Sequence, residues 1–246
     1  KIFIHVNKQI GGVKSGSNSD RNKVALRTGN WPSGTTLQID IGSSGRIQGA
    51  GGNGRQGATN SGTPSQAFPG SSGLGIEYAA QINNNGIIRC GYGGGGGGAG
   101  SWSDPNKNPR DFGRSGGGGG GGAGIPAGDG GPQNTGGYGS AGNGGPSDQN
   151  GKGKAGSDAS FDAGGNGGAG GQHGEGGGQA GSGGIGGDKN DAAASGTAGS
   201  PNRGGGGSPG INGYGLIFSS TSVQNNSTGD KTLASADGGV QVGSVL

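Results

Sequence analysis

Apolar and polar side chains alternate in only a few short stretches of this chain. KIFIHV (1–6) and LQIDI (37–41) alternate with a period of two, and YGLIFSSTSV (214–223) carries another apolar run. This pattern predicts short, half-buried β-strands. RIQ (46–48) begins a returning strand, and IEYAAQINNNGIIRC (76–90) predicts two strands joined by an Asn-Asn-Gly hairpin turn. Because no segment has the 3.6-residue periodicity of an amphipathic helix, we expect strands and no α-helix.

Glycine dominates the pattern from residue 91 onward. Of the 246 residues 74 are Gly, and only 24% are hydrophobic, which is about half the usual apolar share. Such a composition favours disorder, because too little apolar surface can be buried to offset the chain entropy. However, GGGGGGAG (93–100) and GGGGGGGAG (116–124) flank an insert rich in side chains, SWSDPNKNPRDFGRS (101–115). Flexible linkers lack such inserts, and collagen requires a strict Gly-X-Y period.

An ordered alternative is a stack of polyglycine chains in the polyproline II geometry. Such a chain has three residues per turn, rises about 3.1 Å per residue and points its N–H and C=O groups sideways in three directions. Without a Cβ, neighbouring chains can approach to backbone distance and hydrogen-bond to one another. A rod enclosed by others must be nearly pure Gly. We therefore expect 93–98 and 116–122 to be enclosed, antiparallel neighbours that display 101–115 where they turn.

These patterns divide the chain into three expected parts. Residues 1–48 form a strand-rich base, residues 49–215 a stacked polyglycine II sandwich with variable loops, and residues 216–246 a C-terminal strand and tail. The predicted fold class is all-β to irregular: a small β-strand base that supports the polyglycine II sandwich, with no α-helix.

The charged and reactive residues predict neither catalysis nor a cofactor. The net charge is +3 and the positive residues are scattered, so a nucleic acid partner is not expected. GAGGNG (49–54) fits GxGxxG, but no helix follows it. GGIGGDKND (183–191) is a single imperfect copy of a calcium-binding nonapeptide, which we interpret as a solvated turn. The lone Cys90 is expected to be a buried small hydrophobe. The sequence thus predicts no catalytic residue and no metal site.

Two motifs together resemble a known family. LQIDIGSSGRIQGAGGNG (37–54), then INNNGIIRCGYGGGGGGAG (82–100), a variable insert and a second glycine run resemble the receptor-binding adhesins at the long tail fibre tips of T-even-like bacteriophages. The resemblance covers about residues 37–215. It implies a polyglycine II sandwich on the virion, at the tail fibre tip, whose distal loops contact a bacterial outer-membrane protein or surface glycan. The family's N-terminal fibre-attachment part is not apparent, so the other partner is a tail-fibre protein or the rest of the same fibre chain.

The resemblance makes insert 101–115 the first distal loop. Trp, Phe and Arg are the side chains most typical of binding hot spots, and Arg pairs well with the carboxylates or phosphates of a glycan. The predicted receptor-binding residues are Trp102, Asp104, Lys107, Arg110, Phe112, Arg114 and Phe161. For Trp102, Phe112 and Phe161, local loop packing stays an alternative. A polyglycine II ice-binding protein and a structural glycine-rich protein are the alternative functions.

Overall fold

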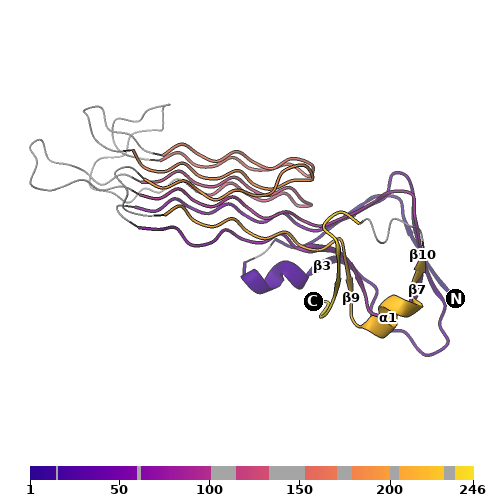
Figure 1. Cartoon of the computed structure of the whole chain (residues 1–246). Helices are drawn as coiled ribbons and strands as arrows, with labels where there is room; N and C mark the ends of the chain where they lie inside the picture. Colours follow the sequence, from indigo (N-terminus) through magenta and orange to yellow (C-terminus); the bar gives the residue numbers. More distant parts are fainter. Residues whose placement is uncertain are drawn as a thin grey trace, which may run out of the picture.

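The computed structural model describes residues 1–14, 16–59, 62–100, 115–132, 153–170, 179–199, 205–229 and 236–246. They form a block of short strands, which holds both termini, and a bundle of long extended segments that projects from it (Figure 1). In the described part of the chain, no helix is long and apolar enough to cross a membrane.

The strands form three sheets, and all the pairings between the described strands are parallel. The first sheet holds β1 (Ile2–Val6), β4 (Leu37–Ile41), β7 (Ala80–Asn84) and β10 (Thr228–Gly229). The second holds β2 (Gln9–Gly11), β5 (Arg46–Gln48) and β8 (Ile87–Arg89). The third holds β3 (Val24–Arg27), β6 (Ser72–Ile76), β9 (Leu216–Phe218) and β11 (Val240–Val242).

The chain visits these sheets in rotation, which makes the block a parallel β-helix. β1, β2 and β3 belong to successive sheets, and β4 to β6 and then β7 to β9 repeat the order. Because each turn stacks on the one before, equivalent aliphatic positions form columns in the interior. Three such columns are Ile4, Ile39 and Ile82; Ile10, Ile47 and Ile88; and Leu26, Leu74 and Leu216. The column residues of the second and third turns are buried, whereas those of the first turn are only partly buried.

The predicted hairpin at Asn84-Asn85-Gly86 is wrong, and so is the return of 46–48 beside 37–41. β7 and β8 lie in different sheets, as do β4 and β5. The chain turns a corner between β7 and β8, where the Gly86 N–H donates to Asn84 Oδ1 at 2.9 Å. A Cβ at Gly86 would lie 2.3 Å from the Gly45 carbonyl oxygen in the corner below. Glycine is therefore required by the stacking of corners rather than by a hairpin.

The all-β class is confirmed, with one departure. A short helix, α1 (Thr221–Asn226), follows β9, and Ser220 caps it by accepting the Val223 N–H at 3.3 Å. Six residues are too few to show helical periodicity in the sequence. A 3₁₀ turn, η1 (Asn18–Asn22), lies between β2 and β3. The division at 1–48, 49–215 and 216–246 stays a prediction; within the middle part, the chain returns to the β-helix at β6, β7 and β8.

The glycine-rich segments leave the β-helix after β5 and again after β8 and run side by side (Figure 1). Their hydrogen bonds arrange them in three layers. One outer layer contains 62–71, 49–59 and 126–132, and the other contains 192–199, 179–187 and 163–170. The middle layer contains 205–213, 91–100, 115–124 and 153–160.

Backbone hydrogen bonds between these segments repeat every three residues. Successive amides point in three directions: Gly94 donates to Phe68, Gly95 to Gly120 and Gly96 to Ala194, at 3.0, 2.7 and 3.0 Å. Gly98, three residues after Gly95, donates to Gly117 and so returns to the segment that holds Gly120. Three residues per turn is the period of a polyglycine II helix.

Segments 91–100 and 115–124 are the interior of the bundle. The N–H groups of 115–124 donate to 49–59, 153–160 and 179–187, and its C=O groups accept from 91–100, 126–132 and 163–170. A Cβ at Gly119 would lie 1.9 Å from the Gly95 carbonyl oxygen. The expectation that 93–98 and 116–122 are enclosed, antiparallel and necessarily glycine is therefore confirmed.

Candidate functional site

The described segments repeatedly end on the face of the bundle away from the β-helix. The chain leaves that face at Thr59, Gly100, Pro132, Gly170 and Gly199, and it returns at Gly62, Ser115, Gly153, Gln179 and Gly205. Hydrogen bonds keep these ends together: the Gly153 N–H donates to Ser115 Oγ at 3.2 Å, and the Gly181 N–H donates to the Ala99 carbonyl at 2.9 Å. We call this face the far end. The opposite end of the bundle, where it meets the β-helix, is called the sheet end. At the rise of polyglycine II, Gly100 lies about 25 Å from Tyr92, which is at the sheet end.

Six of the seven predicted receptor-binding residues belong to insert 101–115. Trp102, Asp104, Lys107, Arg110, Phe112 and Arg114 lie outside the described residues. The flanking residues Gly100 and Ser115 both belong to the far end.

Phe161, the remaining predicted residue, lies at the sheet end of the bundle. The Gly124 N–H donates to the carbonyl of its neighbour Ser160 at 3.3 Å, so the turn lies where the bundle meets the β-helix. The guanidinium of Arg46 is 5.1 Å from the ring centroid of Phe161, whose carbonyl accepts from Gln48 Nε2 at 2.9 Å. A receptor contact through Phe161 stays a prediction; its observed contacts are with β5.

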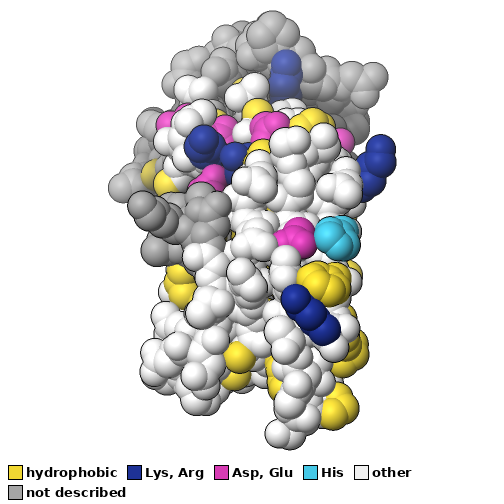
Figure 2. Space-filling view, turned by 90° about the vertical axis from the view of Figure 1, so that its right-hand side faces the viewer, with side chains coloured by type: hydrophobic (Ala, Val, Ile, Leu, Met, Phe, Trp, Pro, Cys, Tyr) yellow, Lys and Arg dark blue, Asp and Glu magenta, His cyan; other side chains and the backbone are white. Residues whose placement is uncertain are grey.

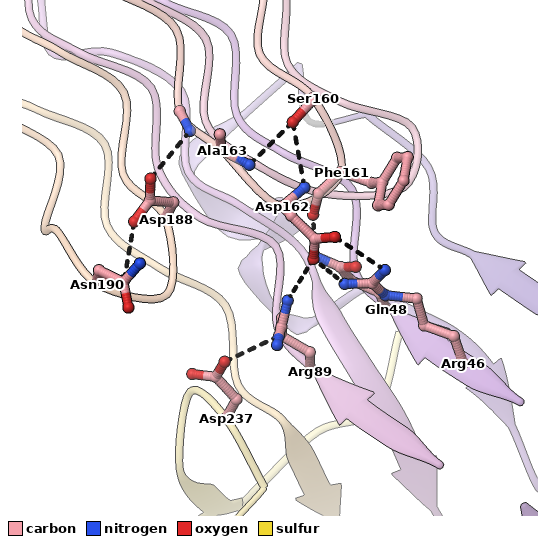
Figure 3. Close-up of polar contacts among 11 residues, drawn as sticks. Arg46, Gln48, Arg89, Ser160, Phe161, Asp162, Ala163, Asp188, Asn190 and Asp237 are labelled. Atoms are coloured by element: carbon pink, nitrogen blue, oxygen red, sulfur yellow. Dashed lines mark hydrogen bonds and ion pairs between the residues drawn. The ribbon is translucent and has the colours of Figure 1, made fainter. Parts of the chain in front are cut away.

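Beside Phe161, a charged junction joins the bundle to the β-helix (Figure 3). Asp162 bonds Arg46, with Nη1 and Oδ2 3.4 Å apart, and it bonds Arg89 at 2.7 Å. Arg89 Nε also lies 2.9 Å from Asp237 Oδ2. Both arginines are buried. Hydrogen bonding from Arg46, with the charges of both arginines, outweighs desolvation and lowers the pKa of Asp162. The junction therefore holds an ionised carboxylate against two buried cations.

The buried groups next to this junction are not reactive at neutral pH. Cys90 follows β8 directly, is fully buried and forms no disulfide. Burial raises the pKa of its thiol to about 12, and burial likewise raises the pKa of Tyr92. The expectation of a buried Cys90 is confirmed, and neither group is a nucleophile in this state.

The calcium-like nonapeptide forms part of a glycine segment and a tight turn. Asp188 accepts backbone N–H groups from Asn190 at 2.8 Å, Asp191 at 3.0 Å and Gly164 at 3.3 Å. Burial raises the pKa of Asp188, but these N–H donors outweigh it and the net shift is downward. Within the described ranges, no three His, Cys, Asp or Glu residues are grouped so that they could hold a metal ion. The carboxylate thus stabilises a turn.

Sequence reasoning missed the junction arginines. Each lies in a three-residue strand, RIQ or IIR, directly before the chain enters a glycine excursion. An arginine in a short apolar strand directly before a glycine-rich segment is the sequence signal that could have indicated this site. Its partner, Asp162, is more than seventy residues away from either arginine, so no local pattern joins them.

Comparison with known proteins connects this architecture to a family. The model of the phage tail fibre adhesin Gp38 family matches residues 1–198. The chain is also similar to the solved gp37-gp38 adhesin tip complex of the bacteriophage S16 long tail fibre, with 22% identity, a TM-score of 0.38, and coverage of 99% of this chain and 70% of that chain. No curated protein matches. Because the family model covers most of the chain, the protein belongs to the phage tail fibre adhesins and is a component of the virion, as the sequence predicted.

Proposed function

We propose that this adhesin recognises a bacterial receptor through the segments that leave the glycine bundle at its far end. The observation that carries this proposal is that the described segment ends gather on one face, about 25 Å from the β-helix. Variable segments on a rigid scaffold commonly carry function. Because the scaffold is hydrogen-bonded along its length, binding at its far end requires no ordering of the scaffold itself.

Residues 101–115 are the first of these segments, and their composition suits a surface partner. Trp102 and Phe112 would supply apolar contact area, while Arg110 and Arg114 would pair with carboxylates or phosphates. Asp104 and Lys107 add charges of both signs. The partner is an outer-membrane protein or a surface glycan of the host.

The first turn of the β-helix is the proposed attachment surface for a tail-fibre protein or the rest of the same fibre chain. β1, β2 and β3 are each the edge strand of their sheet. Parallel sheets are usually covered, and an open edge such as that of β1 or β2 can pair with another chain. At the β3 edge, the Val24 N–H already donates to the Leu246 carbonyl. Ile4 and Leu26 are only partly buried there, and Phe3 is 49% exposed. Hydrophobic side chains also lie on the side of the β-helix that faces away from the bundle, mainly in the lower half of Figure 2.

An exchange of the first far-end segment tests the receptor proposal. Residues 101–114 are replaced by the corresponding segment of an adhesin with a different host, and phage adsorption is measured on both hosts and on receptor-deletion strains. We expect adsorption to follow the segment. Replacement of the exposed Lys189 and Asn190 by alanine, in a turn where the bundle meets the β-helix, is the control and should leave adsorption unchanged. Unchanged host range after the 101–114 exchange would overturn the proposal.

Family membership favours adhesion over the two alternative functions. Adhesins are binding proteins, so the family also favours binding over catalysis. No observation on the described residues favours an ice-binding or a structural role over adhesion.

A further inference from the structure

A groove runs along the outer layer of the glycine bundle, on segments 49–59 and 62–71. Its volume is about 570 Å³, within the usual range of small-ligand sites. Its lining combines one cation, several polar side chains, an aromatic ring and proline: Arg55, Gln56, Thr59, Thr63, Phe68 and Pro132. Thr59 and Thr63 place one end of the groove next to the far end.

Arg55 is the cation of this groove and is available to a ligand. Its guanidinium lies 5.4 Å from the ring centroid of Phe68. Within the described part of the chain, no carboxylate lies within ion-pair distance of Arg55, whereas Arg27, Arg46 and Arg89 are all paired. A guanidinium that rests on an aromatic ring keeps its edge N–H groups free to form two parallel bonds to an anion.

The backbone holds Arg55 and Phe68 in place. The Arg55 N–H donates to the Gly95 carbonyl at 3.1 Å, and the Arg55 carbonyl accepts from Gly119 at 2.8 Å. The Phe68 carbonyl accepts from Gly94 at 3.0 Å. The backbones of both residues are therefore fixed to the interior segments of the bundle, so that binding orders only their side chains.

We propose that this groove binds an acidic sugar of the bacterial surface glycan, as a second contact beside the receptor-binding end. Arg55 binds the carboxylate or phosphate of the sugar. Thr59 and Thr63 offer hydrogen bonds to its hydroxyls, and Phe68 packs against its apolar ring face. This inference rests on the proposed function, because it presumes that the far end is brought to a bacterial surface.

Solution NMR of the whole chain tests the site. The probes are glucuronic acid, N-acetylneuraminic acid and glucose 6-phosphate, with glucose as the neutral control. We expect the acidic sugars to shift the amide signals of 54–59 and 63–68 in a saturable manner, with a Kd of about 1 mM, as suits a small ligand with few contacts. Glucose should cause much smaller shifts. Binding by either acid class supports the proposal, and the class that binds identifies the anion as carboxylate or phosphate.

Arg55→Gln should weaken this binding about tenfold or more, because it removes a charge-assisted pair. Lys189→Gln removes an exposed cation from the turn at the sheet end and should leave binding unchanged. Unchanged amide signals in 91–100 show that each variant is folded. The proposal is overturned if no acidic sugar gives saturable shifts, if glucose binds equally well, or if Arg55→Gln binds like the wild type. None of these results depends on the 101–114 exchange, so the two proposals fail separately.

Discussion

Asp162 bonds Arg89 at 2.7 Å across the boundary between the glycine bundle and the β-helix, although 73 residues separate them in sequence. The same carboxylate bonds Arg46 (Figure 3). The side chains of Arg46 and Arg89 are only 8% and 10% exposed, whereas that of Asp162 is 54% exposed. A buried cation that loses its partner is strongly destabilising. The charge of Arg46, and part of that of Arg89, is thus balanced by one carboxylate at the surface.

Asp162→Asn should therefore lower the free energy of unfolding by about 2 kcal/mol. This is less than the loss of about 3–5 kcal/mol expected for a fully buried pair, because Asp162 is half exposed and Arg89 keeps Asp237. For a chain of this size the expected fall in Tm is about 4–8 °C. Differential scanning calorimetry measures it.

Asp191→Asn is the matched control for this prediction. Asp191 is exposed in a turn at the same end of the bundle, and its side chain makes no hydrogen bond or ion pair with the described residues. Its replacement should change the free energy of unfolding by less than about 0.5 kcal/mol. Equal Tm values for the two variants would show that Asp162 does not hold the junction.

The bonds between Asp162 and the two arginines predict a loss of stability in acid. Hydrogen bonding from Arg46 lowers the pKa of Asp162 in the folded protein, so protonation favours the unfolded chain. The contribution is fully present above the ordinary aspartate pKa of about 3.9 and is lost as the pH falls through the lower, folded pKa. The difference in Tm between wild type and Asp162→Asn should therefore narrow below about pH 4. Thermal unfolding followed by circular dichroism, from neutral to acidic pH, measures this difference in Tm. A difference that stayed constant down to acidic pH would contradict the prediction.

An alanine in the interior of the bundle should be far more damaging than one at its edge. A Cβ at Gly119 would lie 1.9 Å from the carbonyl oxygen and 2.4 Å from the carbonyl carbon of Gly95. Both atoms are backbone and cannot rotate away, so the lattice must separate. Gly119→Ala should cost about 3 kcal/mol or more, at the upper end of overpacking effects. Denaturant unfolding of the purified variant measures this cost.

Gly205→Ala provides the comparison, because a Cβ there meets nothing within 4 Å. It should be neutral or stabilise by up to about 1 kcal/mol, since alanine restricts the unfolded chain. If Gly119→Ala unfolds at the same denaturant concentration as Gly205→Ala, segment 115–124 is not enclosed.

The sequence predicted the glycine bundle well because enclosure excludes side chains. Where a segment has neighbours on every side, as 93–98 and 116–122 do, only glycine fits and the run is visible in the sequence. The strands were predicted at Ile2–Val6 and Leu37–Ile41 by their alternation. Alternation tells which face is buried but not which strand lies alongside. For that reason Asn84-Asn85-Gly86 suggested a hairpin, whereas the chain turns a corner there.

The junction was not predictable in the same way. Its bonds join Asp162 to strands more than seventy residues earlier, and sequence patterns report local order only. An aromatic residue in a polar insert, such as Phe161, suggests a binding residue from its type alone, whichever end of the bundle it occupies. Which end that is follows from how many glycine segments precede it, and the inserts that separate those segments have no fixed length.

Cys90 offers a probe of junction opening in the native protein. It is fully buried beside Arg89, and burial raises its thiol pKa to about 12. At pH 8 only roughly one thiol in ten thousand would be the reactive thiolate, even with access to reagent. Iodoacetamide should therefore label Cys90 very slowly in the folded chain and rapidly in denaturant, as followed by intact mass. If labelling requires the junction to open, a loss of about 2 kcal/mol in Asp162→Asn should speed it about thirtyfold, while Asp191→Asn should label like the wild type. Labelling of the native wild type at the rate of a free thiol would contradict the buried position of Cys90.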